Sequence, residues 1–145
     1  MADYHKVGLL VVRNGRMLLC RKKKGTSLLI LPGGCFEPGE TAEQCLRREL
    51  EEELGPVSVA SLQFIGTYSD VSAGDPTKRV VVELYRGELV GDPRASSEIA
   101  ELHWFAPDGD ESLLAPSIRN HILPDLRLRG LLSESEHPNP TRMSS

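Results

Sequence analysis

Residues 33–56 of the chain read GGCFEPGETAEQCLRRELEEELGP, a glycine-rich loop that runs directly into an acidic, helix-forming segment. Thr41 is a good helix N-cap, and Gln44 three residues later completes a capping box. Gly55 and Pro56 end the helical pattern. The sequence therefore predicts a helix over residues 41–54. The preceding Pro32-Gly33-Gly34 predicts a constrained loop, because two glycines permit backbone angles that other residues resist.

The acidic side chains of this helix divide between two faces. At about 100° per residue, Glu49, Glu52 and Glu53 fall within about 60° of one direction, on the side shared with apolar residues. Three carboxylates at i, i+3 and i+4 on a face expected to meet a sheet repel one another unless a cation lies among them. All-oxygen ligation suits Mg²⁺ or Mn²⁺ better than zinc. The alternative is a solvated helix edge on which Arg47 and Arg48 pair with the glutamates. Glu43 and Glu51 belong to the opposite, solvent-facing side.

The charged and glycine positions of this stretch resemble the Nudix box. That box is a Gly, five residues, a Glu, seven residues, and then Arg-Glu-aliphatic-any-Glu-Glu-any-Gly-aliphatic. The matching positions here are Gly34, Glu40, Arg48, Glu49, Leu50, Glu52, Glu53 and Gly55. The departure is Pro56 in place of an aliphatic residue, which concerns packing after the helix rather than the charged groups. The chain is therefore identified as a member of the Nudix family, of the MutT-like kind.

The resemblance implies an α+β fold, a mixed β-sheet sandwiched between helices, and hydrolysis of a nucleoside diphosphate linked to another moiety. Water would attack phosphorus with the help of Mg²⁺ or Mn²⁺. By the family pattern, Glu49, Glu52, Glu53 and the carbonyl of Gly33 would bind the metal. Glu40 and Arg48 would hold the loop against the helix. The general base would be Glu49, Glu53 or Glu98, with a glutamate of the box ranked first.

The substrate is less constrained than the chemistry. The small size fits an enzyme acting on nucleoside triphosphates or oxidised nucleotides, and ADP-ribose or another nucleoside diphosphate sugar is the second choice. A non-catalytic nucleotide-sensing protein is the rival class, although such proteins usually lose box carboxylates that this chain keeps. An RNA 5′-end processing enzyme would use the same site, and the lack of a marked basic stripe counts against it.

The rest of the chain predicts strands around this unit. Residues 7–12 and 17–20 flank Arg13-Asn14-Gly15-Arg16 and indicate a β-hairpin. Further expected elements are a short strand at 28–31, strands at 58–68, 79–89 and 102–105, a hairpin tip at 73–76, and a helix at 117–126 whose end Pro124 weakens. We expect a single domain over residues 1–132 and a mobile tail at 133–145, where no apolar periodicity is present.

Composition bounds the remaining possibilities. The chain has 145 residues, a formal net charge of −4, 39% hydrophobic residues and 5% aromatic residues. Mild acidity and few aromatics argue against a duplex nucleic-acid binder. No apolar run approaches the roughly 20 residues of a membrane span, so we expect a cytoplasmic protein without a signal peptide. Relatives commonly dimerise, so a homodimer is possible, although the sequence identifies no interface.

Four features stay open between a functional and a structural interpretation. The basic run 21–24 could meet substrate phosphates, but such runs are more often solvated. Trp104 could stack on a base, although core packing is the commoner role of a single Trp. Glu98 and Glu101 could lie in the site or on the surface. Cys20, Cys35 and Cys45 cannot all pair within one chain and are expected to be structural thiols.

Overall fold

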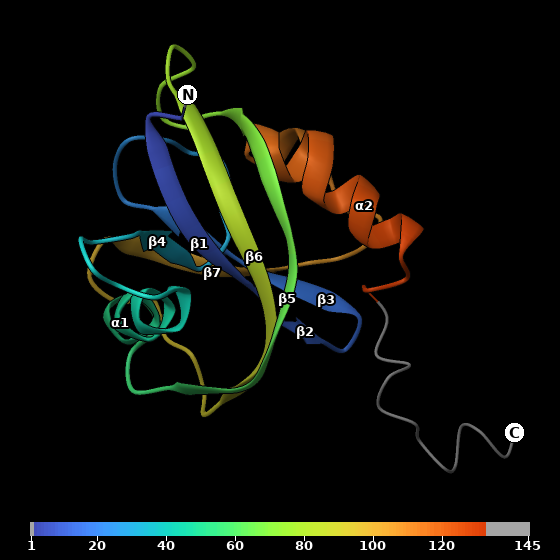
Figure 1. Cartoon of the computed structure of the whole chain (residues 1–145). Coiled ribbons are helices and arrows are strands. Elements are labelled where there is room, and N and C mark those ends of the chain that lie inside the picture. The colour runs from blue at the N-terminus through green and yellow to red at the C-terminus, as the bar shows by residue number, and fades with distance from the viewer. Residues whose placement is uncertain (1, 133–145) are drawn as a thin grey trace, which may run out of the picture.

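The computed structural model describes residues 2–132, which form two β-sheets with one helix on each side (Figure 1). One sheet has the strand order β4-β1-β6-β5, with β1 and β6 parallel and the other neighbours antiparallel. The second sheet is antiparallel, in the order β2-β3-β7. The bounds are β1 (Tyr4–Leu10), β2 (Val12–Arg13), β3 (Arg16–Lys22), β4 (Gly33–Cys35), α1 (Ala42–Leu54), β5 (Ser58–Val71), β6 (Arg79–Val90), β7 (Ile99–Phe105), a 3₁₀ turn (Glu111–Leu113), a π-helical turn (Ile118–Ile122) and α2 (Leu123–Leu128). The expected α+β fold with a mixed sheet between helices is confirmed.

The core consists of two apolar clusters, one under each helix. Cys45, Leu46, Leu50 and Leu54 bring α1 into one cluster, while Ile122, Leu123 and Leu126 bring the C-terminal helical segment into the other. Strand β1 serves both clusters, since Leu9 belongs to the first and Leu10 to the second. Successive side chains of a strand point to opposite faces, so β1 is buried on both sides of its sheet.

The hairpin around Asn14-Gly15 is confirmed. Asn14 and Gly15 have φ of 53° and 73°, the positive values that a tight type I′ turn requires. The first strand differs from the expectation, because it begins at Tyr4 and is divided after Leu10. Strand β1 pairs with β4 and β6, whereas β2 pairs with β3 in the other sheet. The chain thus crosses from one sheet to the other within the apolar run.

Two expectations around the glycine loop are wrong. Residues 28–31 form no strand, because Leu29 and Ile30 make only isolated bridges to Leu114 and Cys20. Conversely, Gly33 and Gly34, expected in a loop, belong to β4 and pair antiparallel with β1. Gly33 has φ of 133°, and a Cβ there would collide with the Val7 carbonyl oxygen. The two glycines let β4 approach β1 and α1 closely, which local sequence patterns could not reveal.

The other strands lie where the sequence predicted them but are longer, and the hairpin tip at 73–76 joins β5 to β6 as expected. The expectation that Pro124 weakens the C-terminal helix is wrong, because the helix continues to Leu128. A π-helical turn precedes α2, and Pro124 lies in the first turn of α2. Proline is tolerated there, since the first amides of a helix have no intrahelical partner.

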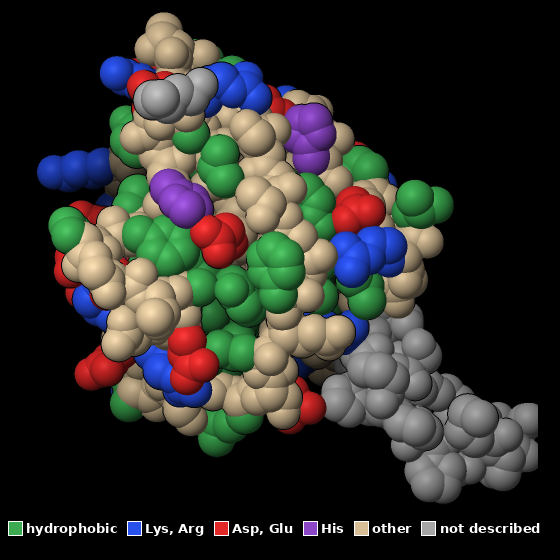
Figure 2. Space-filling model, viewed as in Figure 1, with side chains coloured by type: hydrophobic (Ala, Val, Ile, Leu, Met, Phe, Trp, Pro, Cys, Tyr) green, Lys and Arg blue, Asp and Glu red, His purple; other side chains and the backbone are tan. Residues whose placement is uncertain are grey.

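Helix α1 covers only part of its side of the four-stranded sheet. Seen from that side, hydrophobic side chains are visible over the middle of the sheet (Figure 2). Phe64 on β5 is 51% exposed, and its ring meets Tyr85 of β6 edge-on with centroids 5.3 Å apart. No helix within residues 2–132 is long and apolar enough to span a membrane. The expected tail at 133–145 lies outside the described residues, and the domain boundary at 132 stays a prediction.

Candidate active site

Strand β4 and helix α1 hold two carboxylates against the glycine pair. The backbone amide of Gly33 donates to Glu53 Oε1 at 2.9 Å. The Cα of Gly34 faces the Glu49 side chain so closely that a Cβ would overlap its carboxylate. Both side chains come from the end of α1 that lies beside β4, and Glu49 is only 16% exposed. The glycines therefore position Glu49 and Glu53 by direct contact.

The surroundings of these two carboxylates favour their neutral forms. The pKa of Glu53 is raised to about 8. Burial is the main cause and the neighbouring Glu49 adds to it, while the hydrogen bond from the Gly33 amide lowers the pKa. Burial also raises the pKa of Glu49, opposed by Arg48 and supported by the like charge of Glu52. Two half-buried acids, of which Glu49 disfavours the ionisation of Glu53, form a site at which a cation would relieve the repulsion.

Glu52 does not share this environment. Its side chain is 55% exposed, and Oε1 lies 3.8 Å from Arg48 Nη1. The prediction of one inward carboxylate face therefore holds for Glu49 and Glu53 and is wrong for Glu52. The buried direction of α1 is set by Leu46, Leu50 and Leu54, which centre on the far side of Glu49 and Glu53 from Glu52. The exposed Glu51 and Glu43 lie on the solvent side as predicted.

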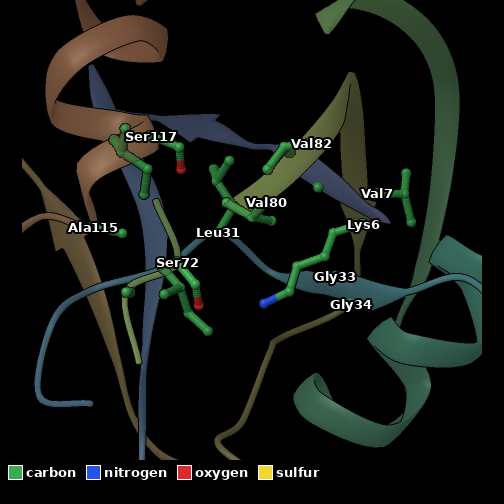
Figure 3. Close-up of a pocket in the computed structure, with 14 residues that line it drawn as sticks. Lys6, Val7, Leu31, Gly33, Gly34, Ser72, Val80, Val82, Ala115 and Ser117 are labelled. Atoms are coloured by element: carbon green, nitrogen blue, oxygen red, sulfur yellow. The ribbon is translucent and has the colours of Figure 1, made fainter. Parts of the chain in front are cut away.

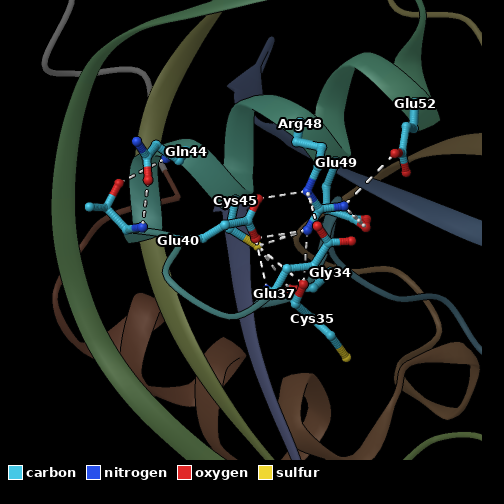
Figure 4. Close-up of polar contacts among 10 residues, drawn as sticks. Gly34, Cys35, Glu37, Glu40, Gln44, Cys45, Arg48, Glu49 and Glu52 are labelled. Atoms are coloured by element: carbon cyan, nitrogen blue, oxygen red, sulfur yellow. Dashed lines mark hydrogen bonds and ion pairs between the residues drawn. The ribbon is translucent and has the colours of Figure 1, made fainter.

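Arg48 connects the loop before α1 to the helix itself (Figure 4). Its Nε donates to Glu40 Oε2 at 2.7 Å and its Nη2 to Glu40 Oε1 at 2.9 Å, a two-pronged pair. Nη2 also donates to the Cys35 carbonyl at 3.1 Å, and Nη1 reaches Glu49 Oε1 at 3.4 Å. The Arg48 guanidinium lowers the pKa of Glu40 to about 2. The expected contact between loop and helix is present, while the catalytic relevance of both residues stays a prediction.

The remaining candidates lie outside this cluster. Glu98 is exposed beside Lys22, Lys23 and Lys24, and within residues 2–132 no hydrogen bond or ion pair joins it to the box glutamates. Glu101 accepts from Arg21 Nε at 2.9 Å. Trp104 packs against the core cluster of α1, with the Arg13 guanidinium 5.8 Å from its ring centroid. Glu101 and Trp104 thus have structural partners.

The donor set fits a hard divalent ion by its chemistry. Glu49, Glu52, Glu53 and the Gly33 carbonyl offer only oxygen ligands, as Mg²⁺ prefers. In their present rotamers, no three His, Cys, Asp or Glu side chains of residues 2–132 converge closely enough to hold an ion. Glu49 and Glu53 are gathered at the glycines of β4, whereas Glu52, the residue before Glu53, is exposed.

A small cavity of about 60 Å³ borders Gly33 and Gly34 and was not anticipated. Lys6 extends into it from β1, and Ser72 and Ser117 line it from other segments (Figure 3). The sequence could have indicated the position of Lys6, because Lys6 precedes an apolar run and shares a strand face with Gly8 and Leu10. Ser117 is buried next to a π-helical turn, and nothing local in the sequence indicated its position.

Comparison with known proteins agrees with this geometry. The model of the NUDIX domain family matches residues 4–126. A Bacillus subtilis (strain 168) protein named for 8-oxo-dGTP diphosphatase activity is 29% identical over 79% of this chain and 74% of its own length. The NAD-capped RNA hydrolase NudC of Pseudomonas aeruginosa is 33% identical over 79% of this chain, but the chain spans only 41% of its length.

A solved structure supports the same conclusion. The MutT NUDIX hydrolase from Burkholderia pseudomallei superposes with a TM-score of 0.65 at 28% identity, covering 74% of this chain and 85% of that one. The family match and the relatives named for diphosphatase and hydrolase activity define the class as Nudix pyrophosphohydrolases, hydrolases acting on acid anhydrides. The chain belongs to the NUDIX domain family.

Proposed function

We propose that this protein hydrolyses a pyrophosphate bond of a nucleoside triphosphate or oxidised nucleotide, with Mg²⁺ or Mn²⁺ held by Glu49, Glu52, Glu53 and the Gly33 carbonyl. The observation that carries this proposal is the pair Glu49 and Glu53, packed half-buried on Gly33 and Gly34 with raised pKa values. When bound, the metal would neutralise charge on the phosphate oxygens and lower the pKa of a coordinated water.

The chain's own residues would orient the reacting groups. The Gly33 amide fixes one oxygen of Glu53, which sets the direction of the other. Arg48 holds Glu49 and Glu40 together and thereby fixes the loop that joins β4 to α1. A box carboxylate, Glu49 or Glu53, would take the proton from the attacking water. Glu98 is the weaker candidate, because it lies among the lysines of residues 22–24 rather than at the glycine pair.

The relatives favour nucleotides as substrates but differ in kind. The Bacillus relative is named for a nucleoside triphosphate carrying an oxidised base, which supports the first choice. NudC is named for NAD-capped RNA, which keeps an RNA 5′ end as a second candidate. ADP-ribose or another nucleoside diphosphate sugar remains an alternative, as does nucleotide sensing without turnover. The retained box carboxylates favour an enzyme over a sensor.

One panel assay separates these functions. Chromatography would separate and quantify the hydrolysis products formed from nucleoside triphosphates, 8-oxo-dGTP, ADP-ribose, dinucleoside polyphosphates and NAD-capped RNA, first with Mg²⁺ and then with excess chelator. We expect turnover of triphosphates that the chelator abolishes. Preference for ADP-ribose or capped RNA would mean that this ligand, and not a triphosphate, is the substrate. Tight nucleotide binding without any turnover would favour the nucleotide-sensing function. Light scattering of the same sample would test whether the protein is a homodimer.

Glu53→Gln tests the role of the box directly. We expect the variant to fold but to lose at least about 100-fold in metal-dependent kcat/KM, because it removes a charged ligand. Glu51→Gln is the matched control, since Glu51 lies on the same helix and is exposed to solvent. Full activity in Glu53→Gln, or an equal loss in Glu51→Gln, would contradict the proposed mechanism.

A further inference from the structure

The cavity beside the glycine pair opens into a larger one. A second cavity, of about 270 Å³, shares Lys6, Ile30, Ser72 and Ala73 with the first. The two are therefore parts of one cleft. Its inner end is apolar, bordered by Val80, Val82 and Ile118, while its outer end is bordered by Lys22 and Lys24. The cleft is bordered by Gly33 and Gly34, the two residues that contact Glu53 and Glu49.

Lys6 and Lys22 have no partner for their ammonium groups. Both side chains are partly buried, yet within residues 2–132 neither makes a side-chain hydrogen bond or an ion pair. Their neighbour Arg21, in contrast, is paired with Glu101. Figure 3 shows the Lys6 side chain reaching into the cavity, with its nitrogen between the segments of Ser72 and Gly33. A partly buried cation without a partner loses hydration, and a bound anion would compensate for that loss.

Lys6 and Lys22 border the outer cavity together with Cys35, the residue that follows Gly34 in β4. In the pairing of β1 with β4, Lys6 lies opposite Cys35 and Val7 lies opposite Gly34, which packs on Glu49. A ligand held by these lysines would therefore be adjacent to the site of hydrolysis. The outer part of the cleft is bordered by Lys24 as well, so three lysines surround it.

The basic run is not uniform in this respect. Lys22 and Lys24 border the cleft, whereas Lys23 does not, and all three lysines border a separate hollow beside Ser97 and Glu98. The backbone amide of Lys23 instead donates to the Glu98 carbonyl at 2.8 Å. The same segment thus contains two lysines that border the cleft and, between them, one of equal charge that borders only the hollow beside Glu98.

We propose that Lys6, Lys22 and Lys24 form a seat for a chain of phosphates that selects triphosphate ligands over diphosphates capped by a sugar at each end. Ammonium groups bind phosphate as compact point charges. A terminal triphosphate carries more negative charge than a doubly capped diphosphate, and it would use all three lysines. The inference rests on the proposed function for the position of the reacting bond, and it adds the residues that determine the ligand class.

Binding of inorganic tripolyphosphate tests the seat without turnover. Titration calorimetry on the full chain in EDTA would compare tripolyphosphate with pyrophosphate. We expect tripolyphosphate to bind more tightly, and Lys6→Gln and Lys22→Gln each to weaken it about tenfold, the effect of one charge-assisted contact. Lys23→Gln is the matched control and should bind as the unchanged protein does. Equal binding of the two anions, or equal effects of Lys22→Gln and Lys23→Gln, would overturn the proposal.

A second measurement does not depend on variants that fold. Cys35 is exposed and borders the outer cavity, so tripolyphosphate bound there should slow its alkylation in the unchanged protein. An unaltered alkylation rate at saturating tripolyphosphate would contradict the seat. Because neither assay needs metal or hydrolysis, anion binding without turnover would keep this inference and reject the proposed function. Turnover that is unchanged in Lys6→Gln and Lys22→Gln would keep the proposed function and reject this inference.

Discussion

Gly34 lacks a side chain where the Glu49 carboxylate needs the space. A Cβ at this position would overlap the carboxylate of Glu49, while Gly34 itself has an ordinary backbone conformation. Gly34→Ala should therefore fold but displace Glu49 from β4. We expect kcat/KM to fall by about 100-fold, since small misplacements of a catalytic group have effects of that size. Steady-state kinetics at saturating Mg²⁺ would measure this loss.

A double variant shows whether the effect passes through Glu49. If Gly34→Ala acts by displacing that carboxylate, the combination with Glu49→Gln should be no less active than Glu49→Gln alone. Additive losses would mean that the methyl group disturbs β4 or the cleft instead. Far-UV circular dichroism of each variant would confirm that the comparison is made between folded proteins.

At the scale of single residues, the spacing predicted which residues lie close together better than it predicted how each side chain is oriented. Fixed separations along one helix and its preceding loop identified Glu40, Arg48, Glu49 and Glu53, because these contacts are local in sequence. The orientation of Glu52 depends on which side chains of α1 the sheets bury, and that is a tertiary property. Lys6 joins the site only through the pairing of β1 with β4, which the sequence did not predict.

At the scale of elements, Thr41 begins the helix that carries the site. Its hydroxyl accepts from the Gln44 amide at 3.2 Å, and Gln44 Oε1 accepts from the Thr41 amide at 2.9 Å. Thr41→Ala should lower the free energy of unfolding by about 1 kcal/mol, the usual effect of losing an N-cap. Urea denaturation would measure the change. Thr41→Ser keeps the hydroxyl and should retain most of the stability; equal losses in both variants would show that the cap is not responsible.

Elements with local signals were predicted, and those without were not. The capping box and the Asn-Gly turn are each set by a few adjacent residues, and both are present as expected. Strand β4 begins with two glycines and exists because β1 offers a free edge. Residues 28–31 are apolar but have no continuous partner. The π-helical turn before Pro124 likewise follows from packing of Ile118 and Ile122 into the core.

At the scale of the whole molecule, the fold holds two acidic side chains in buried positions that lower its stability. Two sheets and α1 bury Glu49 and Glu53 side by side, although either acid alone would be more stable in water. Such local conflict with stability is expected where a site is built for a ligand rather than for folding. Removal of one of these charges should then stabilise the metal-free protein while it abolishes the response to metal.

Glu53→Gln makes this trade measurable. The pKa of Glu53 is about 8 in the folded protein and near 4.3 when unfolded, so its contribution to stability is complete below about pH 4 and declines as pH rises to 8. In EDTA, the free energy of unfolding of Glu53→Gln should therefore rise relative to that of the unchanged protein between about pH 5 and 8. The difference should reach at least about 1 kcal/mol at pH 9. Denaturant unfolding across this range would measure the gain.

With metal bound, the unchanged protein should instead be more stable than Glu53→Gln. At a Mg²⁺ concentration of about 100 times its Kd, the unchanged protein should gain about 2.7 kcal/mol, because the ion binds only the folded state. Glu53→Gln should gain little, while the exposed Glu51→Gln should follow the unchanged protein in both conditions. If Glu53→Gln were the less stable protein in EDTA at pH 9, the Gly33–Glu53 hydrogen bond would outweigh the burial of charge. Glu53 would then be a structural residue of the β4–α1 junction, and the metal ligands would have to be sought elsewhere in the cleft.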